Sequence, residues 1–148
     1  MTVDVTTSIV IERPRHEVFE YAADLDRTTA WYRNITDVAW LTPKPLEVGS
    51  RVTFTARFLG RELAYTYEVR DLAQDERLVM STQEGPFPME TTYLWEDESE
   101  GATRMTLRNR GEPSGFSNVA APMMARAMRR ANRKDLEQLM RLIEREAR

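Results

Sequence analysis

The stretch RVTFTARFLGRELAYTYEVR, residues 51–70, decides the fold because apolar and polar side chains alternate along it on both sides of a glycine. Before Gly60, the apolar positions are Val52, Phe54, Ala56 and Phe58; after it, they are Leu63, Tyr65, Tyr67 and Val69. A period of two is typical of strands that bury one face, and Gly60 marks the turn between them. The stretch therefore predicts a β-hairpin with one apolar face.

Similar alternating segments continue the sheet along the chain. These segments are residues 3–12, 35–42, 76–83, 89–97 and 102–111. Consecutive strands with short turns between them predict one antiparallel sheet of about seven strands. Between the first two strands, Pro14 and the apolar stripe that follows it predict one short helix, and residues 26–34 predict a second.

From about Ser117 to the end, the pattern changes to that of one long helix. Apolar residues recur there at spacings of three and four, and they are Met124, Ala127, Met128, Ala131, Leu136, Leu139 and Ile143. Roughly 30 helical residues would extend about 45 Å. A curved sheet that buries one face needs a cover, and this helix supplies it. We therefore expect a single α+β domain over residues 1–148.

Composition narrows the class of protein. Apolar residues make up 41% of the 148 residues and charged residues 30%, as in an ordinary globular domain. The net charge of -3 argues against non-specific nucleic-acid binding. The absence of cysteine excludes disulfides and thiolate chemistry. With no signal peptide and no membrane-spanning run of about 20 apolar residues, a cytoplasmic protein is expected.

Six segments carry a family resemblance that spans nearly the whole chain. They are IERPRHEVFEYAADLDRTTAWYRNI, GSRVTFTARFLGRELAYTYEV, ERLVMST, TYLWED, TRMTLRNRGEP and ANRKDLEQLMRLIE. Together they resemble the polyketide cyclase/dehydrase branch of the START/Bet v 1-like (SRPBCC) superfamily. The resemblance implies the helix-grip fold, a curved antiparallel sheet wrapped around a long C-terminal helix with an apolar cavity between them. It also implies binding of lipids, sterols, polyketides or other apolar molecules, and in some members cyclase, aromatase or hydratase activity.

If that cavity exists, the inward faces of the strands and the start of the long helix line it. By alternation, the ligand-binding candidates are Phe54, Phe58, Tyr65, Tyr67, Met80, Thr91, Tyr93, Trp95, Met105, Asn109, Met124 and Met128. Thr82, Leu107, Ala127 and Ala131 share these faces. Apolar walls with a few hydroxyl and amide groups suit a hydrocarbon or aromatic ligand that carries one or two oxygens.

Each candidate also has a purely structural interpretation. A buried tyrosine usually sends its hydroxyl to a nearby partner, and Asn109 fits a satisfied core amide or a residue at the end of a strand, since Gly111 follows closely. The methionines fit ordinary core packing as well as an adaptable ligand wall. A β-bulge between Thr91 and Trp95 would exchange the inward and outward side chains of that strand. Trp31 and Trp40 fit either the cavity opening or the anchoring of the short helices.

His16 is the only histidine, and histidine is the commonest general base near neutral pH. It lies in the first turn of the first short helix, off the apolar stripe, so a solvated position is expected. One histidine without cysteine does not make a metal site, and the hydrolase and phosphate-loop motifs are absent. Neither a metal nor a cofactor is therefore expected. The catalytic residues stay unassigned, because the superfamily shares no catalytic motif and no acidic or basic side chain faces inward in the middle of the predicted strands.

The long helix is rich in basic residues. They are Arg126, Arg129, Arg130, Arg133, Lys134, Arg141 and Arg145. Acidic residues follow among them at Asp135, Glu137, Glu144 and Glu146, and pairs such as Glu137 and Arg141 have the spacing of surface ion pairs. We expect a solvated face, with docking onto an acidic partner protein as the alternative.

Three functions remain open. The first is a carrier or sensor of a small apolar molecule, which needs only the cavity. The second is a cyclase, aromatase or dehydratase that uses cavity tyrosines such as Tyr65, Tyr67 and Tyr93, together with Asn109, to polarise a carbonyl. The third is a partner-binding module that acts through the arginine-rich helix. The resemblance also allows a homodimer, which nothing in the sequence requires.

Overall fold

The order of secondary structure in the computed structural model is the predicted one. The described residues are 3–58, 60–85, 88–112 and 121–146, without the side chains of Phe58 and Ala121. The strands are β1 (Val3–Ile11), β2 (Ile35–Trp40), β3 (Arg51–Phe58), β4 (Arg61–Ala73), β5 (Arg77–Glu84), β6 (Met89–Ser99) and β7 (Ala102–Gly111). The helices are α1 (Arg15–Ala22), the 3-10 turn η1 (Leu25–Arg27), α2 (Thr28–Trp31) and α3 (Ala121–Glu146).

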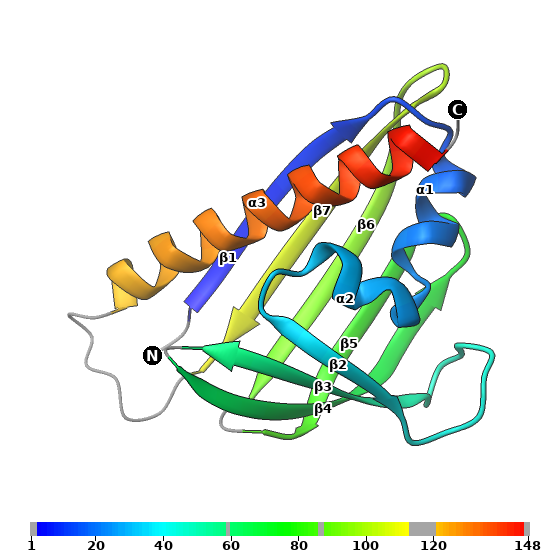
Figure 1. Cartoon of the computed structure of the whole chain (residues 1–148). Coiled ribbons are helices and arrows are strands. Elements are labelled where there is room, and N and C mark those ends of the chain that lie inside the picture. Colours follow the sequence, from blue (N-terminus) through cyan, green and yellow to red (C-terminus); the bar gives the residue numbers. More distant parts are fainter. Residues whose placement is uncertain (1–2, 59, 86–87, 113–120, 147–148) are drawn as a thin grey trace.

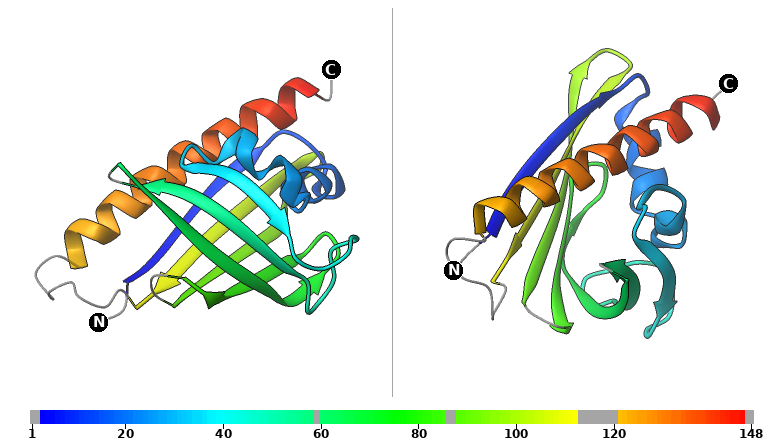
Figure 2. Two further views of the ribbon diagram at one scale, coloured as in Figure 1. Left: turned by 60° about the horizontal axis from the view of Figure 1, so that its bottom comes forward. Right: turned by 60° about the vertical axis from the view of Figure 1, so that its left-hand side comes forward.

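The seven strands form one antiparallel sheet in the order β1-β7-β6-β5-β4-β3-β2. The sheet curls, and α3 lies across its concave side together with the short helices (Figure 1). Breaks in register lie in β2, between β4 and β5, and between β6 and β7. Such bulges bend strands and help a sheet to curl. The predicted helix-grip fold is confirmed, and both views in Figure 2 show the same arrangement.

Alternation places the expected side chains on the inner face. Thr91, Tyr93 and Trp95 in β6 are all buried, and the break in register in this strand falls later, between Asp97 and Ser99. The bulge that would have reversed the inward and outward side chains is therefore not at Thr91 to Trp95. Apolar side chains from β3 to β7 join the C-terminal half of α3 in one hydrophobic core.

The short helices close one end of the sheet. Pro14 immediately precedes the first residue of α1, where its missing N–H costs no hydrogen bond. Phe19 from α1 packs edge-to-face on Trp95 of β6, with ring centroids 5.0 Å apart. The predicted second helix is shorter than expected, since η1 and α2 end at Trp31 and the chain becomes extended at Tyr32.

Helix α3 buries only part of its length. Its predicted start near Ser117 lies outside the described residues, and the described helix has 26 residues. Between residues 122 and 131, no side chain is fully buried, and the first buried residue is Asn132. The expectation that Ala127 faces the sheet is wrong, because Ala127 is exposed. The apolar stripe at the start of the helix is therefore only partly covered by the described part of the sheet.

Candidate functional site

Along β6 and β7, the exposed fraction of the inward side chains rises slightly from one end of the strands to the other. Near α1, Trp95 and Met105 are neighbours across β6 and β7 and are 1% and 0% exposed. Two rows further along the same strands, Thr91 and Asn109 are neighbours and are 5% and 8% exposed. We call the region from Thr91 and Asn109 onward the open end of the interior.

The wall of the open end on β3 and β4 is aromatic. Phe54 and Tyr67 meet edge-to-face with ring centroids 5.6 Å apart, and the rings of Tyr65 and Tyr67 are 6.4 Å apart. Gly85 leaves room for the ring of Tyr65, because a Cβ at that position would lie 2.7 Å from the Tyr65 Cδ1. Tyr65 and Tyr67 are half-buried, while Phe54 is buried. The side chain of Phe58 lies outside the described residues.

The predicted methionines fall into two groups. Met80 and Met105 are buried in the hydrophobic core. Met124 and Met128, near the start of α3, are half-buried. Their neighbour Met123 is 75% exposed. Met124 and Met128 thus have the same intermediate burial as Tyr65 and Tyr67.

The polar side chains of the open end bond to one another. Thr91 donates its hydroxyl to the amide oxygen of Asn109 at 2.7 Å. Burial raises the pKa of Tyr67 to about 12, and a hydrogen bond with Thr91 opposes that rise. Neutral tyrosines of this kind act as hydrogen-bond partners and are poor bases near neutral pH.

A hydroxyl pair joins the short helices to the sheet, and sequence reasoning identified only one member. The Tyr32 hydroxyl, just after α2, lies 2.7 Å from the Tyr93 hydroxyl in β6. The ring of Trp31 packs on both tyrosines, with centroid distances of 4.2 Å and 5.9 Å. Burial raises the pKa of both hydroxyls above the ordinary tyrosine value. No alternation pattern identifies Tyr32, because it lies outside any strand or helix.

Asp135 is the inward carboxyl that the sequence analysis did not find. It was counted among the solvated acids of α3, yet it is 4% exposed. Its Oδ1 accepts the backbone N–H of Arg33 at 3.1 Å. Burial raises the pKa of Asp135 from 3.8 to about 6, which that hydrogen bond and the charge of Arg33 partly oppose. Its negative charge also raises the pKa of Tyr32 and Tyr93.

Helical spacing contained a signal for Asp135. Asn132 lies four positions before the buried Leu136, and Asp135 lies four positions before the buried Leu139. The structure therefore corrects the expectation that Asp135 belongs to the solvated face of the long helix.

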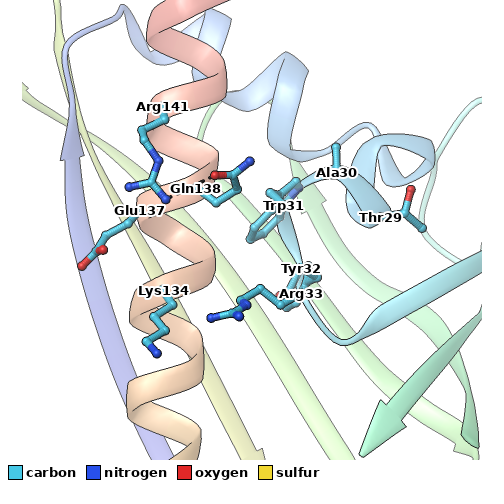
Figure 3. A pocket seen from close by; sticks show the side chains of 9 residues that line it. All are labelled: Thr29, Ala30, Trp31, Tyr32, Arg33, Lys134, Glu137, Gln138 and Arg141. Carbon is cyan, nitrogen blue, oxygen red and sulfur yellow. Dashed lines mark hydrogen bonds between the residues drawn. The ribbon is translucent and has the colours of Figure 1, made fainter.

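An open groove of about 510 Å³ separates α2 from α3 (Figure 3). Its walls are Thr29 to Arg33 on one side and Lys134, Glu137, Gln138 and Arg141 on the other. In Figure 3, Trp31 lies opposite Gln138, and Arg33 reaches toward α3. Since Tyr32 lines this groove and also bonds to Tyr93, it separates the groove from the inner face of the sheet.

The tryptophans anchor the short helices. Trp31 is buried against the tyrosine pair, and the Trp40 indole N–H donates to Asp26 in η1 at 2.9 Å. Trp40 also lines a second open groove, of about 500 Å³, beside α1 and η1. None of the predicted ligand-binding residues lines either groove.

His16 is a surface residue, as expected. Its imidazole is 52% exposed and lies 2.9 Å from Asp75 and 3.0 Å from Glu20. Within the described ranges, no group of three or more acidic or histidine side chains is placed to hold a metal ion. Among the helices that the structure describes, none is both long and apolar enough to cross a membrane.

The basic residues of α3 up to Lys134 are exposed. They are Arg126, Arg129, Arg130, Arg133 and Lys134, and the structure assigns none of them an ion pair with a described residue. This exposure agrees with the solvated-face interpretation. Docking onto an acidic partner stays a prediction.

A curled antiparallel sheet that grips a long C-terminal helix, with aromatic and polar groups on its concave face, defines the START/Bet v 1-like class of ligand-binding folds. Over residues 2–144, the sequence matches the profile of the family described as polyketide cyclase / dehydrase and lipid transport. The chain belongs to this family. No curated protein matches the sequence.

Solved structures show the same fold over nearly the whole chain. A protein of Thermus thermophilus has 18% identity and a TM-score of 0.84, covering 98% of this chain and 99% of its own. The Zhui aromatase/cyclase of Streptomyces sp. R1128 has 18% identity and a TM-score of 0.81, covering 100% and 97%. A START superfamily protein of Mycobacterium smegmatis has 13% identity and a TM-score of 0.82, covering 96% and 97%. At these identities the similarity shows a shared fold alone.

Proposed function

We propose that the protein binds a small, mainly apolar or aromatic molecule, lipid-like or polyketide-like, at the open end between the sheet and the first half of α3. The observation that carries this proposal is a set of half-buried aromatic and methionine side chains on the concave side of the sheet and on the first half of α3. Tyr65, Tyr67, Met124 and Met128 are only half-buried, whereas Trp95 and Met105 on the same inner face are fully buried. Inward-facing apolar groups that their own chain leaves partly uncovered gain free energy when a ligand covers them.

The chemistry of the open end suits a ligand with an aromatic or hydrocarbon body. Phe54, Tyr65 and Tyr67 offer ring faces and edges for stacking. Met124 and Met128 offer unbranched side chains that adapt to different shapes. Thr91 and Asn109 form the polar side of the wall, with the Thr91 hydroxyl bonded to the Asn109 amide oxygen. In this proposal Trp95 and Met105 shape the floor of the site.

Substitution at Met128 tests this proposal, with Met123 as the matched control on the same helix. Met128→Arg places a charge at the proposed wall and should abolish binding of isopropylnaphthalene, followed by tryptophan fluorescence. Met123→Arg puts the same charge at an exposed position, so binding should be unchanged. Equal binding by both variants and the parent protein would place the ligand elsewhere and contradict the proposal.

Asp135 supports a second candidate function, a cyclase or dehydratase-type enzyme. A buried carboxyl whose pKa lies near 6 is suited to accept a proton from carbon next to a ketone, and hydroxyls such as Tyr32 and Tyr93 stabilise the resulting enolate. A structural neighbour is named as an aromatase/cyclase. This candidate predicts that the protein speeds cyclisation of a poly-β-keto thioester and that Asp135→Asn removes the rate but leaves binding intact. Unchanged rates in the variant would remove Asp135 from the mechanism.

A further inference from the structure

The middle of α3 presents an amide without a partner to the protein interior. Asn132 is 6% exposed, and its Nδ2 makes no hydrogen bond with any described residue. A buried donor that lacks an acceptor costs about 1 to 3 kcal/mol. Asn132 therefore has N–H groups available to an acceptor that enters from outside the chain.

Asp135 follows Asn132 by three positions, so both lie on the same buried face of α3. Its carboxylate accepts one hydrogen bond, from the Arg33 backbone, and has no ion pair within the described ranges. The groups that face Asp135 from other elements are Tyr32 and the cationic Arg33 beyond α2, and Tyr93 in β6. Arg33 is exposed and lines the outer groove, so its charge is largely solvated.

The tyrosine pair adds a second unused donor. In the bond between Tyr32 and Tyr93, one hydroxyl donates and the other accepts. The accepting hydroxyl keeps its own proton, for which the described residues provide no assigned acceptor. This part of the interior thus offers two donor groups without an assigned acceptor, one on Asn132 and one on the tyrosine pair. Asp135, the carboxyl that the described residues place beside them, carries negative charge at neutral pH.

From this arrangement we infer that Asn132, with Asp135 and the Tyr32–Tyr93 pair, selects ligands whose polar end is an uncharged oxygen acceptor, such as a ketone, and rejects an ionised carboxylate. The unused N–H and O–H donors bind the neutral oxygen. A carboxylate is excluded because a second negative charge beside buried Asp135 is repelled and loses its hydration. This inference rests on the proposed function and names the ligand class of the same site.

Three isosteric probes test it. They are methyl naphthyl ketone, naphthoate and isopropylnaphthalene, which share a ring system and differ only at the polar end. At neutral pH the ketone should bind at least about tenfold more tightly than naphthoate, a difference of about 1.4 kcal/mol. The dissociation constants come from calorimetry or tryptophan fluorescence of the full chain.

Two variants assign the preference to residues. Asn132→Leu, which keeps the side-chain shape, should weaken the ketone about fivefold to tenfold and leave isopropylnaphthalene unchanged. Asp135→Asn should narrow the gap between ketone and naphthoate, as should lowering the pH below 5, where the Asp135 carboxyl is protonated. If Asn132→Leu weakened both neutral probes equally, the effect would be structural and the inference wrong.

The outcomes separate this inference from the proposed function. If all three probes bound with equal affinity, or naphthoate bound best, selection of uncharged oxygen would be overturned while ligand binding stood. If none of the three bound, the proposed function would fail and the inference with it. The inference predicts that the parent protein binds the ketone more tightly than naphthoate, and that Asn132→Leu weakens the ketone about fivefold to tenfold while isopropylnaphthalene binds as before.

Discussion

The hydroxyl of Tyr32, at the end of α2, lies 2.7 Å from the hydroxyl of Tyr93 in the middle of β6. This contact joins the segment that covers one side of the interior to the sheet itself. Both rings also contact Trp31, so the pair is held from a third side. The position of the short helices over the sheet therefore depends on two hydroxyl groups.

Removing one hydroxyl of this pair should destabilise the protein, because the other hydroxyl is then left buried without a hydrogen-bond partner. Tyr93→Phe leaves the Tyr32 hydroxyl buried without its partner, so a loss of about 1 to 2 kcal/mol in the free energy of unfolding is expected. Replacing both tyrosines with phenylalanine should cost no more than the single change, because neither hydroxyl is then left unpaired. Urea denaturation of the three variants measures this coupling, and strictly additive losses would show that the bond does not stabilise the fold.

Asp135 should make stability fall as pH rises. Burial raises its pKa from 3.8 to about 6, so the folded protein holds a proton that the unfolded chain releases. The contribution of Asp135 to the free energy of unfolding is fully present below about pH 4. It declines between about pH 4 and pH 6 and stays at its lower value above pH 6. The decline amounts to about 2 to 3 kcal/mol. Urea denaturation at several pH values should show this slope in the parent protein and not in Asp135→Asn.

Asp4 supplies a control of opposite sign. A hydrogen bond from Arg108 lowers the pKa of Asp4, so its contribution to stability is present above its ordinary value and is lost as pH falls. Asp4→Asn should therefore remove stability at neutral pH and change little in strong acid. If both variants had the same pH dependence, the assignment of the slope to Asp135 would be wrong.

His16 should affect stability weakly and ligand binding not at all. The hydrogen bond to Asp75 and the charge of Glu20 raise the pKa of its imidazole above 6.5. Its contribution is complete below pH 6.5 and is lost as pH rises through the folded-state value. NMR titration of the imidazole measures that value. His16→Gln should leave the affinity for isopropylnaphthalene unchanged, and a marked loss of affinity would return His16 to the site.

The C-terminal half of α3 should carry most of the helix's packing energy. Leu139 is completely buried in the core, and Leu139→Ala should cost about 2 to 5 kcal/mol. Leu41, which is 53% exposed, is the matched control, and Leu41→Ala should change stability by less than about 0.5 kcal/mol. Thermal or urea unfolding compares them, and similar losses at both positions would contradict the described packing of α3.

The fold could be predicted from the sequence because the patterns that specify its strands and helices are local. Alternation in residues 51–70 and in the later strands follows directly from the pleat, and one buried face fixes the phase. The sequence also predicted that Thr91, Tyr93 and Trp95 lie on the inner face and that His16 lies on the surface. The prediction that Ala127 faces the sheet was wrong. Helical periodicity identifies the apolar face of a helix, but it does not show how far the sheet extends along that face.

Of the buried polar residues Tyr32, Tyr93 and Asp135, the sequence predicted only Tyr93. Tyr93 follows from strand alternation, but its partner Tyr32 lies in an irregular segment where no period applies. Asp135 looked like a solvated acid because charged residues surround it in the sequence, and only its spacing to Leu139 and Ile143 points inward. Contacts between segments 61 and 102 residues apart in the chain, such as Tyr32 with Tyr93 and Arg33 with Asp135, depend on how the sheet curls.

The central claim is that a ligand binds at the open end beside the first half of α3, and NMR of labelled methionine methyl groups tests it most directly. Met124 and Met128 report on the proposed wall, while the exposed Met123 on the same helix serves as the internal control. On addition of isopropylnaphthalene, we expect saturable shifts of the Met124 and Met128 signals and an unchanged Met123 signal. Shifts confined to Met123, or binding with no shift at Met124 and Met128, would contradict the account.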